Sequence, residues 1–546
     1  MNKIELKPNV CEYVLPVFIV LSLITSCIII SDKKYFWNDE LYSYYLLNDK
    51  SFINMLAAFH DKINNTPPLY FILGWLWVRV FGSTEISLRL FSSIGICIAA
   101  VIVWLILRKS YNFLSTSIGV VSVFCSSNIV IYQNSEARMY GLFTALCALG
   151  LLQYTVLNKT SKDINWKYLL PNICVHAAIV NTHLFGLFYS GAILLSLIIR
   201  DNYLKCFRIR IYISIFLSWF SLVIYIPSFI NQSDAGYPRS WIPIPSLNDL
   251  TNLLNFSSSS FINLILLLLL FIHFIIYAIF CKKYNLTYSS NLINQDNKRK
   301  KEITPFLLIA FIFITTPILI WVISHTFKPI LVDRYMIPSA LGWSILLCQI
   351  SSYVIIKPKF LKTKFSQLQK TYKFIITVWL VIVFVLLITA PINYAINVPK
   401  EKLPEPNIQK TNYNILPVVV QSSHDFLKIF HYSPQRKKYF FILDWESAVD
   451  IRSGNFGSQE YKHLDAFRRN YPDIFQENIV ESENFLNRNK KFLVLDYTYY
   501  IKDCNFNEFH CPQWLEIRVN NNPDYKITVL DNIDDRKLLL VEKLAP

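Results

Sequence analysis

Residues 14–30 read VLPVFIVLSLITSCIII, an apolar run that contains no charged side chain. A helix of about 20 mostly apolar residues is long enough to cross the hydrocarbon core of a bilayer. The whole chain of 546 residues is 53% hydrophobic and 16% charged, whereas soluble domains carry about 25% charged residues. The run and the composition together predict an integral membrane protein.

Further apolar segments follow along the chain, and a few of them are shorter than a full span. The candidate spans are 14–30, 87–107, 114–132, 140–157, 168–182, 184–199, 211–230, 260–280, 305–324, 336–356 and 374–394. Segments 168–182 and 184–199 would form a tight pair with His183 at its turn. We therefore expect an α-helical polytopic membrane protein with about 11 transmembrane helices.

The loops between these segments alternate in charge. Lysine and arginine favour the cytoplasmic side of membrane proteins, and here they crowd loops such as 282–301 and 357–373. The basic residues of the opposite loops 133–139, 231–259 and 325–335 are Arg138, Arg239, Lys328 and Arg334. The alternation predicts a cytoplasmic N-terminus and, with an odd number of spans, an extracytoplasmic C-terminal tail.

The net charge of +16 falls largely on these loops. A nucleic-acid partner would need that charge gathered on one water-facing surface, so topology explains it better and we expect no nucleic acid. The chain shows no endoplasmic-reticulum retention signal, which favours a bacterial cytoplasmic (inner) membrane with membrane lipids as the surroundings.

One apolar stretch, residues 67–81, does not fit as a span. It is short and carries Trp75, Trp77 and Arg79, and if it crossed the membrane every later basic loop would change sides. We predict a helix that lies on the outer membrane surface. Residues 31–86 would then form one long extracytoplasmic loop.

The composition changes from about residue 397, where Pro399, Pro404 and Pro406 mark a linker. We expect a transmembrane catalytic domain at 1–396 and a small extracytoplasmic α/β domain at 397–546. The strand-like runs are 438–444, 491–497, 525–530 and 537–542, and the helical patterns are 423–431, 460–470 and 482–489.

Two further features of this tail bear on its chemistry. The helices follow no glycine-rich phosphate loop, so we assign the tail no nucleotide. Cys504 and Cys511 both lie in polar sequence. Whether they form a disulfide stays open at this point, since that bond needs an oxidising compartment.

The chemistry begins with Asp39 and Glu40, two adjacent carboxylates just after the first span. Partial desolvation near a membrane surface can raise a carboxyl pKa towards that of a general base. An isolated acidic pair usually lies in a solvated loop, so the context of Asp39 and Glu40 decides whether they are functional. Four motifs on the same predicted side supply it: Thr66-Pro67-Pro68-Leu69-Tyr70-Phe71, Glu136-Ala137-Arg138-Met139-Tyr140-Gly141, Thr182-His183-Leu184-Phe185-Gly186-Leu187-Phe188, and Asp333-Arg334-Tyr335 followed by Pro338.

In this order the motifs resemble the C-type (GT-C) glycosyltransferases. The nearest branch is glycosyltransferase family 39, which includes the protein O-mannosyltransferase and lipid A aminoarabinose transferase group, and the resemblance covers roughly residues 10–395. It implies a GT-C-like fold and an enzyme that transfers a hexosyl or pentosyl group, with inversion, from a polyprenyl-phosphate-sugar donor. The acceptor would be a lipid, a glycan or a protein outside the cytoplasm.

The resemblance also suggests roles for single residues. Asp39 is the expected general base, and Glu40 would bind a metal or fix Arg138. Arg334 would hold the leaving phosphate with its planar fork, although a positive anchor at a helix end is the alternative. Arg138 would bind phosphate or pair with Glu136, which would otherwise orient the acceptor or hold a metal.

Three residues have supporting roles in this interpretation. His183 is either a hydrogen-bonded core residue or part of the site, Tyr335 is an interfacial anchor close to it, and Tyr70 lines a lipid groove or anchors the surface helix. Many relatives carry a histidine where this chain has Thr66, so that role is not carried over. A divalent cation between Asp39, Glu40 and phosphate is compatible with the sequence, which does not require one.

Two other functions fit a polytopic protein. A lipid or glycan transporter or flippase would show related halves and charges at mid-membrane, and the sequence shows no internal repeat. A ligase or polymerase of preassembled lipid-linked glycans is the nearest rival within the enzymes. The sugar and the acceptor are left open by the sequence.

Overall fold

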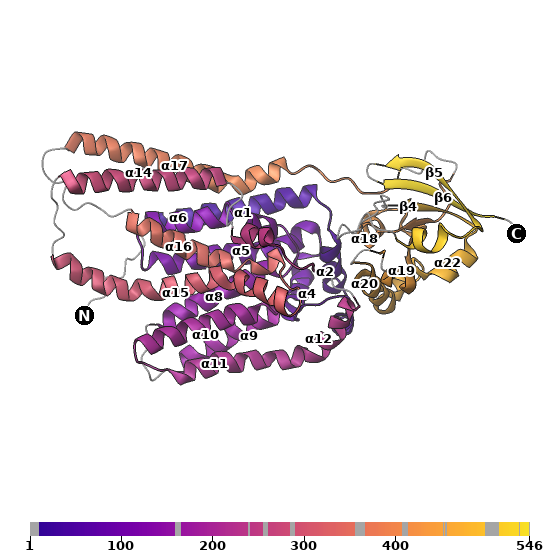
Figure 1. Cartoon of the computed structure of the whole chain (residues 1–546), viewed down its shortest axis with the longest axis horizontal. Helices are drawn as coiled ribbons and strands as arrows, with labels where there is room; N and C mark the ends of the chain where they lie inside the picture. Colours follow the sequence, from indigo (N-terminus) through magenta and orange to yellow (C-terminus); the bar gives the residue numbers. More distant parts are fainter. Residues whose placement is uncertain are drawn as a thin grey trace. The chain divides into compact units, whose positions relative to one another are not determined.

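The computed structural model describes residues 10–158, 165–238, 241–254, 260–283, 290–354, 366–406, 413–450, 452–453, 456–496, 513–533 and 536–544. These residues form two compact units (Figure 1). The first unit comprises Met1–Lys33, Ile86–Leu222 and Ile244–Pro399, and the second comprises Lys34–Glu85, Val223–Pro243 and Lys400–Pro546. Residues 34–85 thus pack with C-terminal residues, while the predicted division of the chain at residue 397 stays a prediction.

Each predicted span coincides with one helix or with a helix that has a break. The first unit is a bundle of helices. They are α1 (Val14–Lys33), α5 (Glu85–Arg108), α6 (Phe113–Phe124), α7 (Asn128–Asn134), α8 (Tyr140–Leu157), α9 (Trp166–Thr182), α10 (Gly186–Tyr203), α11 (Ile209–Trp219), α13 (Leu247–Leu254), α14 (Ser260–Lys283), α15 (Ser290–Thr326), α16 (Ser339–Val354) and α17 (Ser366–Asn397).

Six helical stretches in the described part of the chain are long and apolar enough to cross a membrane. A seventh counts if α6 and α7, which meet at 65°, form one broken span. The six are Val10–Lys33, Glu85–Arg108, Tyr140–Leu157, Ile209–Gly236, Pro305–Thr326 and Val378–Asn397. The prediction of an integral membrane protein is confirmed.

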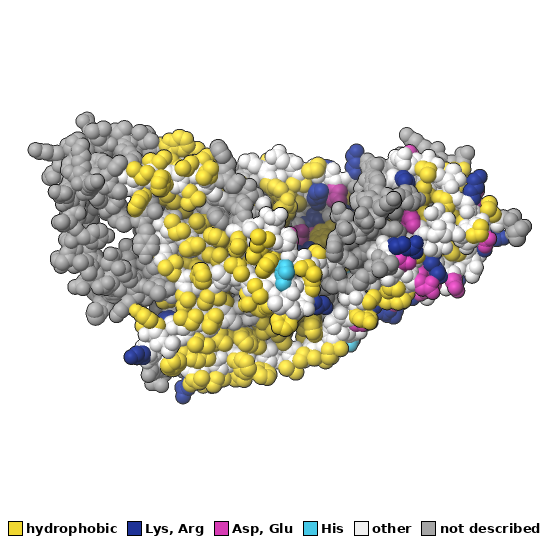
Figure 2. Space-filling view, in the orientation of Figure 1, with side chains coloured by type: hydrophobic (Ala, Val, Ile, Leu, Met, Phe, Trp, Pro, Cys, Tyr) yellow, Lys and Arg dark blue, Asp and Glu magenta, His cyan; other side chains and the backbone are white. Residues whose placement is uncertain are grey.

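The surface of the first unit is apolar. Figure 2 shows hydrophobic side chains over most of its visible helices, and exposed residues such as Phe216, Phe271, Phe311 and Val385 contribute to it. Such a surface would be unstable in water and suits contact with lipid tails.

Close backbone contacts between helices hold the bundle together. A Cβ atom on Gly119 of α6 would lie 2.4 Å from the carbonyl oxygen of Ser344 of α16. Where the surroundings are lipid, helices associate by such close packing of small residues. Lys33 ties the ends of α1 and α17 together, because its Nζ lies 3.0 Å from the carbonyl oxygens of both Ala395 and Val398.

A buried ion-pair network joins three of these helices at Asp201, whose side chain is fully buried. Its oxygens accept hydrogen bonds from Arg208 Nε at 2.8 Å and Nη2 at 2.9 Å, from Arg200 at 2.8 Å and from Tyr212 at 2.7 Å. Arg208 also donates to the carbonyl oxygen of Leu157 at the end of α8. Arg200 and Arg208 therefore have a structural role at this end of the bundle.

Replacing Asp201 by Asn should lower the free energy of unfolding by about 3–5 kcal/mol, because Arg208 would stay buried without its counter-charge. The drop in Tm of the purified protein in detergent measures this. Asp32→Asn removes an exposed carboxylate of α1 and should change stability by less than about 0.5 kcal/mol. Equal effects of the two changes would show that the network adds no stability.

The second unit contains a six-stranded sheet in the order β3-β2-β1-β4-β6-β5. β1 pairs in parallel with β2 and β4, β2 pairs in parallel with β3, and β6 pairs antiparallel with β4 and β5. The strands are β1 (Val418–Val420), β2 (Tyr439–Leu443), β3 (Ile479–Glu481), β4 (Lys491–Asp496), β5 (Tyr525–Ile533) and β6 (Arg536–Lys543). The helices that follow the parallel strands are α18 (Ser423–Tyr432), α19 (Trp445–Val449), α20 (Phe456–Asn470), α21 (Pro472–Phe475) and α22 (Ser482–Arg488).

This topology confirms the predicted C-terminal α/β fold. All four predicted strands are present, and β1 and β3 are additional strands of three residues each. Alternating side chains of β4 and β6 build the core with Val419 of β1, and Phe492 and Val541 are fully buried in it. Cys504 and Cys511 lie outside the described residues.

The second unit also holds α2 (Asn38–Leu47), α3 (Phe52–His60), α4 (Leu69–Phe81) and α12 (Ile226–Ser233). α4 covers the stretch predicted to lie on the membrane surface, and its 13 residues span about 20 Å, too little to cross a bilayer. Leu76, Val80 and Phe81 leave an apolar face exposed. Trp75 and Arg79 instead bond the carbonyl oxygen of Asp49, just beyond α2.

Candidate active site

The segment Glu136–Gly141 is held against α5 by backbone contact. A Cβ on Gly141 would lie 1.9 Å from the carbonyl oxygen of Ser92, and one on Gly95 would lie 2.3 Å from the carbonyl carbon of Gly141. Ser92 Oγ donates to the carbonyl oxygen of Arg138 at 2.9 Å. The two glycines let the start of α8 touch α5, so the backbone that carries Arg138 is fixed in place.

Asn134, at the end of α7, fixes the beginning of the same segment. Its Nδ2 donates to the carbonyl oxygen of Leu23 at 2.8 Å and to Ser26 Oγ at 3.2 Å, and its Oδ1 accepts from Ser93 Oγ at 2.8 Å. One amide thus links α1, α5 and α7. Glu136 lies two residues further on and is half-buried, and its carbonyl oxygen accepts the backbone N–H of Arg138 at 2.8 Å.

His183 lies in the turn between α9 and α10 and is almost fully buried. Its Nδ1 accepts the backbone N–H of Phe185 at 3.2 Å, which places the proton of the neutral ring on Nε2. Burial lowers the pKa of His183 to about 3, and the positive charges of Arg138 and Arg334 act in the same direction. His183 is therefore neutral at physiological pH and suited to hydrogen bonding, not to carrying charge.

Aromatic rings surround this histidine. The centroid of the Tyr335 ring lies 4.7 Å from that of His183, and the rings of Phe143 and Phe185 lie at 5.2 Å and 5.4 Å. The ring of Tyr140 stacks on that of Tyr335 at 6.2 Å. Tyr335 is thus packed within the first unit beside His183, which is a more specific position than a general interfacial anchor.

The positive charges of Arg334 and Arg138 both lower the pKa of His183. Arg334 belongs to the short 3-10 helix η4 (Asp333–Met336) between α15 and α16, and its guanidinium carbon lies 5.8 Å from the Tyr335 ring centroid. Arg138 is 6% exposed. The charges of both arginines reach His183, and an anion bound near them would be stabilised. This part of the first unit is suited to bind a phosphate.

In the second unit, Asp39 and Glu40 occupy the first turn of α2 and have different surroundings. Glu40 is fully buried, and its Oε2 accepts the backbone N–H of Trp37 at 3.2 Å. That bond closes the start of the helix, so Glu40 has a structural role there. Asp39 is half-buried, and the hydroxyl of Ser43 bonds its carbonyl oxygen at 3.2 Å. Asp39 is the better candidate of the two for chemistry.

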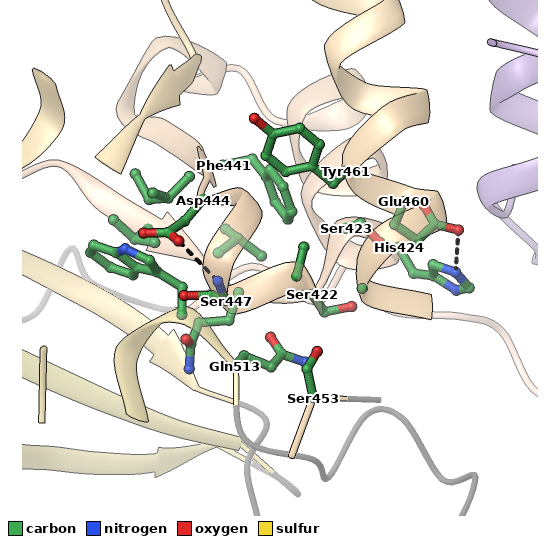
Figure 3. A pocket seen from close by; sticks show the side chains of 17 residues that line it. Ser422, Ser423, His424, Phe441, Asp444, Ser447, Ser453, Glu460, Tyr461 and Gln513 are labelled. Atoms are coloured by element: carbon green, nitrogen blue, oxygen red, sulfur yellow. Dashed lines mark hydrogen bonds and ion pairs between the residues drawn. The ribbon is translucent and has the colours of Figure 1, made fainter. Parts of the chain in front are cut away.

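The neighbours of Asp39 belong to a network that the sequence analysis missed. Asn38 Nδ2 and the Tyr42 hydroxyl donate to Glu460 Oε2 of α20 at 3.2 Å and 2.5 Å. Figure 3 shows the contact on the other oxygen, where His424 Nε2 lies 3.4 Å from Glu460 Oε1. Burial alone would raise the pKa of Glu460, yet the charges of His424 and His463 and the bond from Tyr42 lower it to about 2. No local motif marks Glu460, because its partners are distant in sequence.

Tyr70 and Thr66 lie in the second unit as well. Tyr70 is 1% exposed and packs edge-on against Phe71 at 5.3 Å between ring centroids, so its side chain is part of the core of that unit. Thr66 Oγ1 donates to Asn64 Oδ1 at 2.8 Å, and Asn64 Nδ2 donates back to the carbonyl oxygen of Thr66 at 2.7 Å. The residue that stands in place of the family histidine closes a local turn.

No protein-family model and no curated protein matches the sequence. Solved structures do. The crystal structure of ArnT from Cupriavidus metallidurans bound to undecaprenyl phosphate superposes with a TM-score of 0.52 at 12% identity, covering 97% of this chain and 98% of that one. ArnT from the same organism in the apo state gives a TM-score of 0.52 at 10% identity and covers 98% of each chain.

The chain shares the ArnT fold. The likeness extends over nearly all of both chains, so it includes the helices and the C-terminal α/β part. It confirms the GT-C-like fold that the sequence motifs predict. At this level of identity it concerns the fold, and the roles of Asp39, Glu136, Arg138 and Arg334 stay predictions.

Within this ArnT-like fold, the described residues contain no group of three or more His, Cys, Asp or Glu side chains placed to hold a metal ion. Asp39 and Glu40 are adjacent on α2, but Glu40 is engaged in closing the helix. A divalent cation at this pair would therefore rely on Asp39 and on groups of the substrate.

His424 and His431 of α18 should make opposite contributions to stability as the pH changes. Burial alone would lower the pKa of His424, but the hydrogen bond and charge of Glu460, with the charges of Asp39 and Asp425, raise it above its usual value. Burial lowers the pKa of His431 to about 4, a shift that the charge of Glu85 opposes and that of Arg436 assists.

The protonated His424 therefore stabilises the fold fully below about pH 6.5, and this stability is lost as the pH rises through its raised pKa. The neutral His431 stabilises above about pH 6.5, and this is lost as the pH falls towards 4. The Tm difference between wild type and His424→Gln should therefore shrink as the pH rises above 6.5. The Tm difference between wild type and His431→Gln should shrink as the pH falls from 6.5 towards 4. The same pH profile for all three proteins would contradict both assignments.

Proposed function

We propose that the protein is a membrane glycosyltransferase that moves a hexosyl or pentosyl group, with inversion, from a polyprenyl-phosphate-sugar donor to an extracytoplasmic lipid, glycan or protein. The observation that carries the proposal is that the charges of Arg138 and the half-buried Arg334 both act on the buried, neutral His183 in a chain with the ArnT fold. An ArnT structure with this fold has undecaprenyl phosphate bound. A site suited to an anion within a lipid-facing bundle fits a lipid phosphate.

In the proposed reaction an acceptor hydroxyl or amine attacks the anomeric carbon of the donor sugar. Asp39 takes the proton of the acceptor, the new bond forms at that carbon, and the bond to the phosphate oxygen breaks with its electron pair on the oxygen. The leaving group is the polyprenyl phosphate, whose growing negative charge Arg334 and Arg138 would stabilise. Direct displacement inverts the configuration at the anomeric carbon.

The remaining residues have supporting roles in this proposal. Glu136 would orient the acceptor, since its backbone is fixed beside Arg138. His183 and Tyr335 would shape the donor site through the Nε2–H group and the ring face. Eleven spans with a cytoplasmic N-terminus would place the C-terminal domain outside a bacterial inner membrane, where the acceptor is found.

Asp39→Asn should abolish transfer while leaving the protein folded, because loss of a general base typically costs about 10²–10⁴ in rate. Mass spectrometry of lipids and glycans from cells that express the wild type or the variant would detect the product. Asp32→Asn removes an exposed carboxylate at the end of α1, before Asp39 in the chain, and should retain activity. Full activity of Asp39→Asn would remove Asp39 as the base.

Arg334→Ala should weaken binding of undecaprenyl phosphate about 10- to 100-fold, the loss expected for charge-assisted hydrogen bonds. Arg334→Lys should restore it in part, since a point charge replaces a bidentate fork. Lys328→Ala removes an exposed cation from the same loop and should bind as the wild type does. If Arg334→Ala lowers only the yield of folded protein, Arg334 is an anchor.

A reconstitution experiment separates the transferase from a transporter or flippase. Proteoliposomes are given a labelled polyprenyl-phosphate sugar, and both its movement across the bilayer and the formation of glycosidic products are measured. Movement of the lipid without any product would overturn the transferase proposal. Transfer of a preassembled oligosaccharide in place of one sugar would point to a ligase.

A further inference from the structure

The C-terminal α/β domain contains a cavity of about 90 Å³ at the carboxyl edge of β1 and β2 (Figure 3). One ordered water needs about 10–15 Å³, so the space is large enough for a small organic ligand. Its lining includes His424, Asp444, Ser447, Glu460, Tyr461 and Trp514.

The position of the cavity in the sheet is one at which α/β proteins bind ligands. β2 lies on one side of β1 and β4 on the other, so the order of the strands reverses at β1. Ligands of open α/β sheets bind outside the carboxyl ends of the strands at such a switch point. The cavity is therefore in the right place for a binding site that sequence patterns did not indicate.

The lining does not suit a phosphate or a nucleotide. It includes no lysine or arginine among the described residues, and the segment after β1 reads Gln421-Ser422-Ser423-His424-Asp425 without a glycine. Phosphate sites at this edge normally use a glycine-rich turn that brings backbone N–H groups to the ligand. An uncharged ligand fits the electrostatics better.

The polar side chains in the lining of the cavity are of the kinds that bind hydroxyl groups. Asp444 follows β2, the place where dinucleotide-binding folds put an acidic residue on the hydroxyls of a ribose. Its Oδ1 accepts the backbone N–H of Ser447 at 2.9 Å, and its Oδ2 accepts from Arg518 Nε at 3.0 Å. The charge of Asp444 is thus compensated, and each oxygen retains a lone pair for a ligand hydroxyl.

An unsatisfied hydroxyl in the wall of the cavity is the second observation that points to a ligand. Ser447 is 5% exposed, and within the described part of the chain its Oγ has no hydrogen-bond partner. Buried polar atoms are nearly always paired in folded proteins. Tyr461 and Trp514 add apolar ring surface beside it, as expected for a ligand that carries both C–H and O–H groups.

We propose that this cavity binds one uncharged sugar residue and that this sugar belongs to the acceptor. The assignment to the acceptor rests on the proposed function. Glu460 lines the cavity and also holds Asn38 and Tyr42 of α2, the helix that carries Asp39. A sugar bound here contacts a residue that positions the helix of the proposed base.

The test is equilibrium binding to the full-length protein in detergent, without donor, using glucose, galactose and N-acetylglucosamine as probes and inorganic phosphate as the charged comparison. We expect at least one of the sugars to bind and phosphate not to bind in the cavity. Ser447→Ala should weaken sugar binding about five- to tenfold, the loss expected for one hydrogen bond. Without sugar this variant should be at least as stable as the wild type, because it loses an unpaired buried hydroxyl.

Ser458→Ala is the matched control. Ser458 lies on α20 outside the lining, is 1% exposed, and its Oγ likewise has no partner among the described residues. It should bind sugar as the wild type does. The proposal is overturned if none of the three sugars binds, if phosphate competes for the cavity, or if both serine variants bind sugar equally well.

The outcome can be separated from that of the transferase proposal. If Asp39-dependent transfer is observed and no sugar binds without donor, the cavity proposal fails and the proposed function stands. If a sugar binds as expected and Asp39→Asn leaves a fully active enzyme, the base assignment fails while sugar binding is supported. If sugar binds and no transfer occurs with any donor, the acceptor assignment fails with the proposed function.

Discussion

Hydrocarbon offers no hydrogen-bond partners, so each polar group that a membrane helix buries must find its partner inside the protein. The first unit meets this constraint with a few side chains that each join several helices. Asn134 links α1, α5 and α7, and Asp201 collects two arginines and a tyrosine. The bonds of Asn134, with that of Ser92 to the carbonyl oxygen of Arg138, hold the backbone that carries Arg138 of the candidate donor site. Such placement of a charge would preorganise the site for an anion.

The same constraint explains the state of His183. A protonated imidazole in that turn would add a third positive charge to the two arginines, in surroundings that hydrate none of them well. A neutral ring avoids this cost and keeps an N–H donor. The site therefore concentrates its charge in groups that cannot lose a proton at physiological pH, which suits the binding of a phosphate that stays ionised throughout a reaction.

Much of the fold follows from local sequence. Apolar runs predict the helices of the first unit, and short hydrophobic runs predict four strands of the sheet. The sides of the membrane on which the loops lie stay a prediction from the alternating charge. β1 and β3 were missed because three residues show no periodicity. The acidic pair at Asp39 was found by its motif, whereas its division into a helix-closing Glu40 and a half-buried Asp39 needed coordinates. The contacts of Glu460 with α2 could not be found, since they join residues more than 400 positions apart. The cavity residues come from separate segments between Val419 and Trp514, which no local motif connects.

Glu460 also affects how freely the C-terminal domain could be exchanged. A domain attached by a linker alone is a module, and a related domain could replace it without changing the rest of the chain. Here a carboxylate of that domain accepts hydrogen bonds from Asn38 and Tyr42, both buried at the start of α2. A chimera with a foreign domain would remove the acceptor that Tyr42 and Asn38 share, and leave Asn38 only its bond to the Tyr42 hydroxyl, unless the new domain supplied an acceptor at the same place. The C-terminal domain of this chain should therefore tolerate substitutions inside it more readily than its replacement as a whole.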